Sequence, residues 1–368
     1  MARCRGRDTL DAQETLVIHP RPELDMLPPV VHGGFHSGEG IVLDFSSNIN
    51  PFGPSPRVWE AMRDVVIGQH PDPHAAPLRE FLAAHESVST ERLLVGNGSV
   101  ELIYALAIAF LRPGDAVLVV APTFGEYTTA ARIMGAQVQE FRLHSENDFA
   151  LDVDELLVKV RQVRPRLLFL CSPNNPTSTY VAEQDMKRIL SGCPDTLFVL
   201  DEAFVRFLTD AWSSNGLSEY ENLLILRSLT KDYALTGLRV GYALASASII
   251  RALEKVQPPW SVNSFAQVAS IAAVSDETFF RDSLNKLFLA RNDFAQRLVE
   301  IGLPPLSTRL TFFLVPVPSA TELTRRLAER NLRVRDCTSF GLPQHIRIAT
   351  RSVDENNVLI SALQDLNV

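Results

Sequence analysis

Lys231 is the residue of this sequence best placed to do covalent chemistry. It lies in the stretch RSLTKDYALTGLRVGY (227–242), directly after a short apolar run that predicts a buried strand. Ligands of open α/β sheets bind beyond the carboxyl ends of the strands, so this position suits a reactive side chain. Ser228, Thr230 and Arg239 add hydroxyls and a guanidinium suited to phosphate. An amine beside other cations, if partly desolvated, has a lowered pKa and can form a Schiff base with a carbonyl. Taken alone, a lysine after a strand is more often a solvated loop charge.

Three further apolar strands end in side chains that could complete a site with Lys231. These side chains are Phe124, Asn175 and Asp201. Singly they have ordinary explanations as a core residue, a turn residue and a helix cap. Together with Lys231 they supply a stacking ring, a hydrogen-bond donor, a carboxylate and an amine at one edge of a sheet. That set matches the requirements of pyridoxal phosphate, including a carboxylate for the pyridine nitrogen.

A glycine turn before an apolar helical run offers a second phosphate ligand. Gly96, Asn97 and Gly98 precede Ser99 and Val100, where we expect a helix to begin. Free backbone N–H groups and the positive end of the helix dipole make such a turn an anion site. An ordinary helix cap explains the turn equally well until the cations near Lys231 are considered.

The alternation of strands and helices predicts an α/β fold with a mainly parallel sheet covered on both faces, followed by a smaller α+β unit. We expect an arm and N-terminal extension at 1–50, a large domain at 51–256 and a small domain at 257–368. The first twenty residues show no sustained periodicity and are expected to be poorly ordered. Strands are expected at 41–45, 93–95, 116–120, 137–142, 167–171, 196–200, 223–226, 312–317, 332–335 and 345–349. Helices are expected at 56–66, 76–85, 100–110, 153–163, 183–190, 247–255, from 265 onward, and at 277–301, 320–329 and 354–366.

Composition narrows the class of protein. The 368 residues carry 35 basic and 43 acidic side chains, a net charge of -8, and no long basic cluster, which argues against nucleic-acid binding. No segment approaches the roughly 18 consecutive apolar residues of a membrane span, and the N-terminus lacks the apolar core of a signal peptide. Four scattered cysteines without metal-type spacing fit a reducing compartment. We therefore expect a cytoplasmic protein without a metal site.

These residues resemble the fold-type I pyridoxal-phosphate enzymes of the class I and II aminotransferase group, from His32 onward. The resemblance implies a three-layer αβα fold around a seven-stranded sheet. It implies that Lys231 forms the Schiff base and that Asp201 pairs with the pyridine nitrogen. It also implies that Asn175 bonds the ring hydroxyl oxygen and that Phe124 stacks on the ring. The cofactor phosphate would be held by Ser99, Val100, Ser228, Thr230 and Arg239.

The resemblance further implies a phosphorylated, amino-acid-like substrate. Arg347 would bind its carboxylate and Arg335 its phosphate, with His32, Asn50 and Asn175 as further contacts. It also implies a homodimer with shared active sites. His70 stands where the group usually has a tyrosine that reaches the cofactor phosphate of the neighbouring subunit, which puts that contact in question.

Finer motifs favour one of two branches of the group. The strings FSSNINPFG (45–53), DEAFVRF (201–207), LRSLTKDY (226–233) and PWSVN (259–263) look more like the threonine-phosphate decarboxylases of cobalamin biosynthesis. On that basis we expect decarboxylation of L-threonine O-3-phosphate to (R)-1-amino-2-propanol O-2-phosphate. The alternative is a histidinol-phosphate aminotransferase, which exchanges an amine between histidinol phosphate and 2-oxoglutarate. A third possibility, from another class, is a cofactor-binding protein without turnover.

Overall fold

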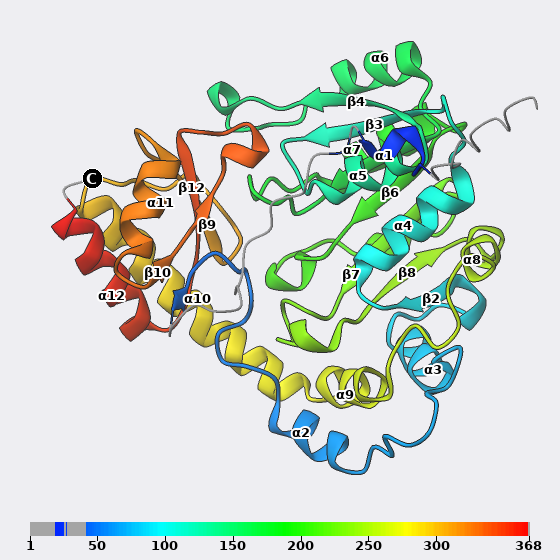
Figure 1. Cartoon of the computed structure of the whole chain (residues 1–368), viewed down its shortest axis with the longest axis horizontal. Helices are drawn as coiled ribbons and strands as arrows, with labels where there is room; N and C mark the ends of the chain where they lie inside the picture. The colour runs from blue at the N-terminus through cyan, green and yellow to red at the C-terminus, as the bar shows by residue number, and fades with distance from the viewer. Residues whose placement is uncertain (1–18, 26, 28–41, 367–368) are drawn as a thin grey trace, which may run out of the picture.

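The computed structural model describes residues 19–25, 27 and 42–366, so His32 and most of the expected N-terminal arm lie outside the described residues. Two sheet-containing units are joined by the long helix α10 (Glu277–Glu300), which leads from α9 (Ser264–Ser275) to the smaller sheet (Figure 1). Among the described residues, no helix is long and apolar enough to cross a membrane. Within the same ranges, no group of three or more His, Cys, Asp or Glu side chains could hold a metal ion.

The large sheet has seven strands, as expected. All of them run parallel except β8, which is antiparallel to its neighbours β2 and β7. In spatial order the strands are β2 (Leu93–Gly96), β8 (Gly241–Ala245), β7 (Leu223–Ser228), β6 (Leu197–Asp201), β5 (Leu167–Cys171), β3 (Ala116–Ala121) and β4 (Gln137–Arg142). Because β8 runs the opposite way, its first residue lies at the edge where the other strands end. Gly241 is accordingly in register with both Ser228 and Gly96.

Helices cover both faces of this sheet, which explains why its central strands are continuous apolar runs. Neighbouring residues of one strand point to opposite faces, so Leu168 joins one buried cluster and Phe169 the other. One face packs against α4 (Ser99–Phe110), α5 (Glu126–Ile133) and α8 (Ala247–Glu254). The other face packs against α3 (Ala76–His85), α6 (Val153–Val163), α7 (Glu183–Gly192) and α9. The expected three-layer αβα architecture is confirmed.

The smaller unit is an antiparallel sheet of three strands packed on helices. Its strands, in spatial order, are β11 (Arg335–Asp336), β12 (His345–Ala349) and β9 (Phe312–Pro316). Its helices are α10, α11 (Ala320–Ala328) and α12 (Val353–Asp365), which begins with a capping box between Ser352 and Glu355. The expected smaller α+β unit is therefore present. The boundaries of the domains remain predictions.

The expected single strand at 332–335 is in fact two strands in different sheets. Leu332–Arg333 forms β10 and pairs in parallel with β1 (Leu43–Asp44), whereas Arg335–Asp336 pairs with β12. The first two residues thus pair with β1, which is remote in the sequence. The local pattern of residues could not indicate this partner. The other helices are α1 (Pro22–Asp25) and α2 (Pro56–Arg63), and α2 ends three residues before the expected Val66. Short 3-10 turns occur at Thr90–Arg92, Ser145–Asn147, Val205–Phe207, Ser214–Leu217, Thr236–Leu238 and Thr338–Phe340.

Candidate active site

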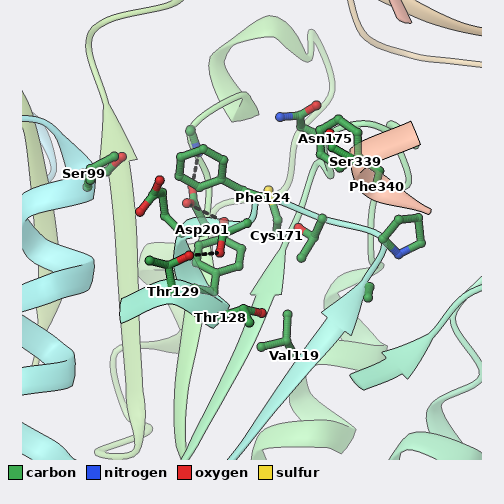
Figure 2. Close-up of a pocket in the computed structure, with 18 of the residues that line it drawn as sticks. Ser99, Val119, Phe124, Thr128, Thr129, Cys171, Asn175, Asp201, Ser339 and Phe340 are labelled. Carbon is green, nitrogen blue, oxygen red and sulfur yellow. Dashed lines mark hydrogen bonds between the residues drawn. The ribbon is translucent and has the colours of Figure 1, made fainter. Parts of the chain in front are cut away.

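A cavity of about 720 Å³ lies at the carboxyl edge of the large sheet and extends to the smaller one. Phe124, Asn175, Asp201 and Lys231 all line it, although they come from four different strand ends. Figure 2 shows Ser99 at one end of the cavity and Ser339 and Phe340 at the other, with Phe124 and Asp201 between them in this view. The structure therefore brings together the four residues that the sequence singled out.

The backbone of Lys231 is held by the segment before α2. The amide of Asn50 donates to the carbonyl of Lys231 at 2.9 Å, three residues beyond the end of β7. Burial, and then the positive charges of Arg239 and Arg347, lower the pKa of the Lys231 amine to about 8. A substantial fraction of this amine is therefore neutral near pH 8, and a neutral amine is the nucleophilic and proton-accepting form.

Asp201 ends β6 as a buried carboxylate with two hydrogen bonds. It accepts from the hydroxyl of Tyr127 at 2.7 Å and from the backbone N–H of Ala203 at 2.9 Å. Burial raises the pKa of Asp201, and these two hydrogen bonds oppose part of the shift. Tyr127 is itself fixed by stacking on Phe169, with ring centroids 4.9 Å apart. Such a carboxylate is poised to meet a cationic group of a ligand, since the structure gives it no buried cation of its own among the described residues.

Hydroxyls, an arginine and a helix N-terminus converge at the end of the cavity where Ser99 lies, opposite Ser339 and Phe340 (Figure 2). The hydroxyl oxygens of Ser228 and Thr230 are 2.6 Å apart, and Arg239 lines the same wall. Ser99 and Val100 begin α4 there, and the preceding residue caps the helix with no side-chain hydrogen bond. This is a donor-rich cup of the kind that binds phosphate. All five residues expected for a phosphate site lie in it.

Two glycines allow the backbone segments of this cup to approach one another. A Cβ on Gly98, whose φ is +79°, would lie 2.9 Å from the guanidinium of Arg239. A Cβ on Gly241 would lie 2.8 Å from the amide nitrogen of Ser99 and 2.7 Å from the carbonyl oxygen of Arg227. A larger side chain at either position would therefore displace the groups that form the cup.

Arg335 and Arg347 lie opposite each other on neighbouring strands of the smaller sheet, and both line the cavity. Both side chains are buried. Arg335 donates to the Ser339 hydroxyl at 2.8 Å and lies over the ring of Phe340. Arg347 donates to the Ser46 carbonyl at 2.5 Å and to the Asn175 side chain. Burial lowers the pKa of Arg347 to about 10, and the charge of Arg335 adds to the effect. Two buried cations side by side favour the binding of an anion.

Asn48 also lines the cavity and was not singled out from the sequence. Its side chain is buried, yet neither its amide nitrogen nor its oxygen has a hydrogen-bond partner among the described residues. A buried amide without partners is costly, so a bound molecule is its natural partner. The signal for it in the sequence was the run of side-chain donors and acceptors at 47–51, which does not say which side chain faces inward.

Two expected substrate or cofactor ligands do not line this cavity. Asn50 is buried outside it, and its side chain donates to the Asp232 carbonyl at 3.2 Å and to the Ser283 hydroxyl at 2.8 Å. The expectation of a substrate contact for Asn50 is therefore not supported, because its amide serves the protein. His70 is exposed and stacks on Trp260, with ring centroids 4.9 Å apart, away from the cavity of its own chain.

The family model for aminotransferase class I and II matches residues 40–363. The chain belongs to this family. It is 35% identical over 332 residues to the histidinol-phosphate aminotransferase of Geobacillus sp. (strain WCH70), covering 88% of this chain and 90% of the relative. Its fold matches that of histidinol-phosphate aminotransferase from Sinorhizobium meliloti in complex with pyridoxal 5'-phosphate, with a TM-score of 0.86 and 22% identity over 96% of this chain and 98% of that one. The chain is thus a pyridoxal-phosphate-dependent enzyme of the class I and II group.

The expectation of a threonine-phosphate decarboxylase is wrong on these findings. Curated relatives at 30 to 35% identity over most of the chain are histidinol-phosphate aminotransferases. An L-threonine-O-3-phosphate decarboxylase from Porphyromonas gingivalis is a structural neighbour, with 28% identity, a TM-score of 0.77 and coverage of 88% of this chain and 98% of that one. The short strings at 45–53, 201–207, 226–233 and 259–263 did not separate the two branches, whereas the relatives match over most of the chain.

The residues present fit pyridoxal phosphate. The cup around Ser228 and Arg239 suits its phosphate, the buried carboxylate of Asp201 suits its pyridine nitrogen, and Lys231 offers an amine with a lowered pKa. The unpartnered side chain of Asn48 and the two buried arginines lie beyond these groups, toward the smaller sheet. They leave room for a second, anionic molecule.

Proposed function

We propose that this protein transfers an amino group between histidinol phosphate and 2-oxoglutarate. The observation that carries the proposal is the buried pair Arg335 and Arg347 at the substrate end of the cavity. A phosphate monoester carries close to two negative charges at neutral pH, and 2-oxoglutarate carries two carboxylates. One pair of guanidinium groups can therefore neutralise either substrate in turn. The names of the curated relatives support the same reaction.

Most site residues would hold and orient the cofactor. Pyridoxal phosphate supplies the electron sink for cleavage of a bond at the substrate α-carbon. We assign the pyridine nitrogen to Asp201, the ring hydroxyl oxygen to Asn175 and the ring face to Phe124. The phosphate is assigned to Ser99, Val100, Ser228, Thr230 and Arg239.

The remaining residues would act on the substrate. Arg335 takes the phosphate of histidinol phosphate, and Arg347 takes the α-carboxylate of glutamate. Asn48 offers its free amide to whichever substrate is bound. The Lys231 amine, whose pKa is lowered to about 8, would accept and move the proton of the substrate α-carbon.

A coupled assay tests this reaction directly. Purified protein with pyridoxal phosphate, histidinol phosphate and 2-oxoglutarate should form glutamate, and omission of either substrate should abolish the product. Carbon dioxide release from L-threonine O-3-phosphate, without glutamate formation from histidinol phosphate, would contradict the proposal. Bound cofactor whose absorbance no amine perturbs would indicate a binding protein without turnover.

Replacement of Arg335 by Gln should raise KM for histidinol phosphate roughly 10- to 100-fold, because a charge-assisted contact contributes about 1.5–3 kcal/mol. The affinity for pyridoxal phosphate should be unchanged, since Arg335 lies at the other end of the cavity from the phosphate cup. Steady-state kinetics and a cofactor titration measure the two effects. Arg333→Gln on β10, which does not line the cavity, is the matched control. Equal KM values for the two variants would remove Arg335 from the substrate site.

We also propose that the protein is a homodimer in which His70 contributes to the partner's site. Large apolar side chains are exposed on α2, which packs against α9, and on the turns next to these helices. Trp59 is 60% exposed, Ile67 81% and Trp260 47%. Exposed apolar surface of this kind is typical of an interface, and two-fold symmetry is the usual arrangement.

The mass in solution should accordingly be twice the 40.8 kDa of the chain. Light scattering after gel filtration measures it. The double variant Trp59→Glu and Ile67→Glu should shift the protein to monomers and weaken cofactor binding, since each site would lose the partner's contribution. A monomeric wild-type protein with full activity would contradict the shared site.

A further inference from the structure

A buried charged network lies behind the cofactor cup, on the opposite face of the sheet. Arg227 is its centre: its guanidinium donates to Glu86 at 2.5 Å and to Glu202 at 3.0 Å. Tyr242 donates its hydroxyl to Glu86 at 2.5 Å. The side chain of Arg227 is only 12% exposed, and those of Glu86 and Glu202 are 7% and 1% exposed. Ser214 and Asn215, in the 3-10 turn at 214–217, complete the network.

Three residues of this network, in or directly after a strand, are immediate neighbours of residues at the cofactor end of the cavity. Glu202 follows Asp201, Arg227 precedes Ser228, and Tyr242 follows Gly241. Alternate residues of a strand point to opposite faces, so one face carries the site and the other carries the network. The registers agree: Arg227 pairs with Tyr242, and Ser228 pairs with Gly241.

The network therefore joins the ends of three adjacent strands. The amide of Glu202 also donates to the carbonyl of Leu226 at 2.8 Å, which extends the pairing of β6 with β7 by one residue. On the cavity side, Gly241 lies against the amide of Ser99. A shift of β7 relative to β6 or β8 would thus change the distance between Asp201 and the phosphate cup.

We propose that Arg227, with Glu86, Glu202 and Tyr242, is a positioning device that sets the spacing between the carboxylate and the phosphate cup of the cofactor site. Arg227 acts through the backbone and touches no ligand. Its planar fork is what permits simultaneous contact with two carboxylates on different elements, which a lysine ammonium could not reproduce in the same geometry.

The charges of the network support a geometric role. Two carboxylates share one guanidinium, and Glu202 keeps one oxygen without a hydrogen-bond partner among the described residues. Burial raises the pKa of Glu202, against the attraction of Arg227. Burial acts in the same direction on Glu86, but Arg227 and Tyr242 outweigh it and leave the pKa of Glu86 lowered. Buried ion pairs add little net stability because their desolvation is costly, so orientation is the more specific contribution.

The variant Arg227→Lys tests the device through cofactor binding. We expect the dissociation constant for pyridoxal phosphate to rise about tenfold, roughly the effect of one impaired charge-assisted hydrogen bond. The pH at which the absorbance of the bound cofactor changes should also move, because the Asp201 carboxylate would be displaced relative to the pyridine nitrogen of the cofactor. Both readouts are independent of substrate, so their failure is distinguishable from failure of the proposed amino transfer.

The matched control is Arg79→Lys on α3, the helix that leads to Glu86. Arg79 forms a partly buried ion pair with Glu254 at 2.7 Å, but neither residue adjoins a cofactor residue. Both variants should lower the melting temperature, and only Arg227→Lys should change cofactor affinity and the absorbance midpoint. If Arg227→Lys fails to fold, Tyr242→Phe should shift both readouts less, in the same direction. Unchanged affinity and midpoint in the folded variants would overturn the proposal.

Discussion

Replacement of Lys231 by methionine should reduce amino transfer by roughly 10⁴-fold, because the variant loses both the nucleophile and the group that moves the substrate α-proton. The change should leave the fold intact, since methionine is an unbranched side chain close to lysine in length and its neutral end removes the repulsion from Arg239 and Arg347. Borohydride reduction followed by peptide mass spectrometry should fix the cofactor on the peptide that contains Lys231 in the wild type. The variant should carry no such label.

Lys187→Met is the control for this experiment. Lys187 lies on α7 in an ion pair with Glu183 at the surface, and its loss should leave labelling and activity unchanged. Label on a lysine other than Lys231, or substantial activity in Lys231→Met, would refute the assignment.

The pH dependence of cofactor uptake by the apo-protein follows from the pKa of the same amine. The neutral fraction of Lys231 rises with pH and levels off above its pKa of about 8. The rate of covalent uptake should therefore reach half of its maximum at about pH 8 and level off roughly one pH unit higher. An ordinary lysine, with a pKa near 10.5, would give a rate that continues to climb beyond pH 9.

Asp201→Asn should lower kcat roughly 10²- to 10³-fold, because the amide cannot stabilise positive charge on the pyridine nitrogen. Asparagine has nearly the same shape and keeps an oxygen that can accept from Tyr127. Stopped-flow measurement of single turnovers would place the loss in the chemical steps. A variant that transfers amines as fast as the wild type would show that Asp201 is only a structural cap.

The variant should also remove the cost of burying the Asp201 charge in the apo-protein. Burial raises the pKa of Asp201, so between its ordinary value of 3.8 and the raised value the folded state binds more protons than the unfolded state. Stability therefore decreases as pH rises through that window, and the asparagine variant escapes this cost at neutral pH. Asp232→Asn is a matched control, because Asp232 is also a buried carboxyl with a raised pKa, about 7, but it does not line the cavity. The Asp232→Asn variant should keep its amino-transfer activity within a few fold of the wild type.

Much of the fold could be predicted from local patterns. Strands such as Leu167–Cys171 and helices such as Val153–Val163 begin and end at the expected residues, because apolar runs and caps are encoded locally. The antiparallel direction of β8 and the split of 332–335 between two sheets could not be predicted. Both depend on partners that are remote in the sequence.

The residue types of the site were readable in the same way. Lys231, Asn175 and Phe124 follow strands, and Asp201 is the last residue of one. Strand ends meet at one edge of a parallel sheet, so the meeting of these residues could be expected from spacing. The orientation of side chains in irregular segments could not. Asn48 faces the cavity and Asn50, two residues later, does not, because Asp232 and Ser283 hold its amide.

The amino-acid sequence was thus sufficient for the cofactor and the family, and it indicated Lys231 as the candidate Schiff-base residue, since these depend on residue types placed after recognisable strands. Tertiary structure alone revealed the side-by-side arrangement of Arg335 and Arg347 and the network around Arg227 behind the cup. The physical reason is that both arise from strand register and from burial shared between distant segments. Neither the register nor the burial can be predicted from one stretch of the chain, because both depend on segments that are distant in the sequence.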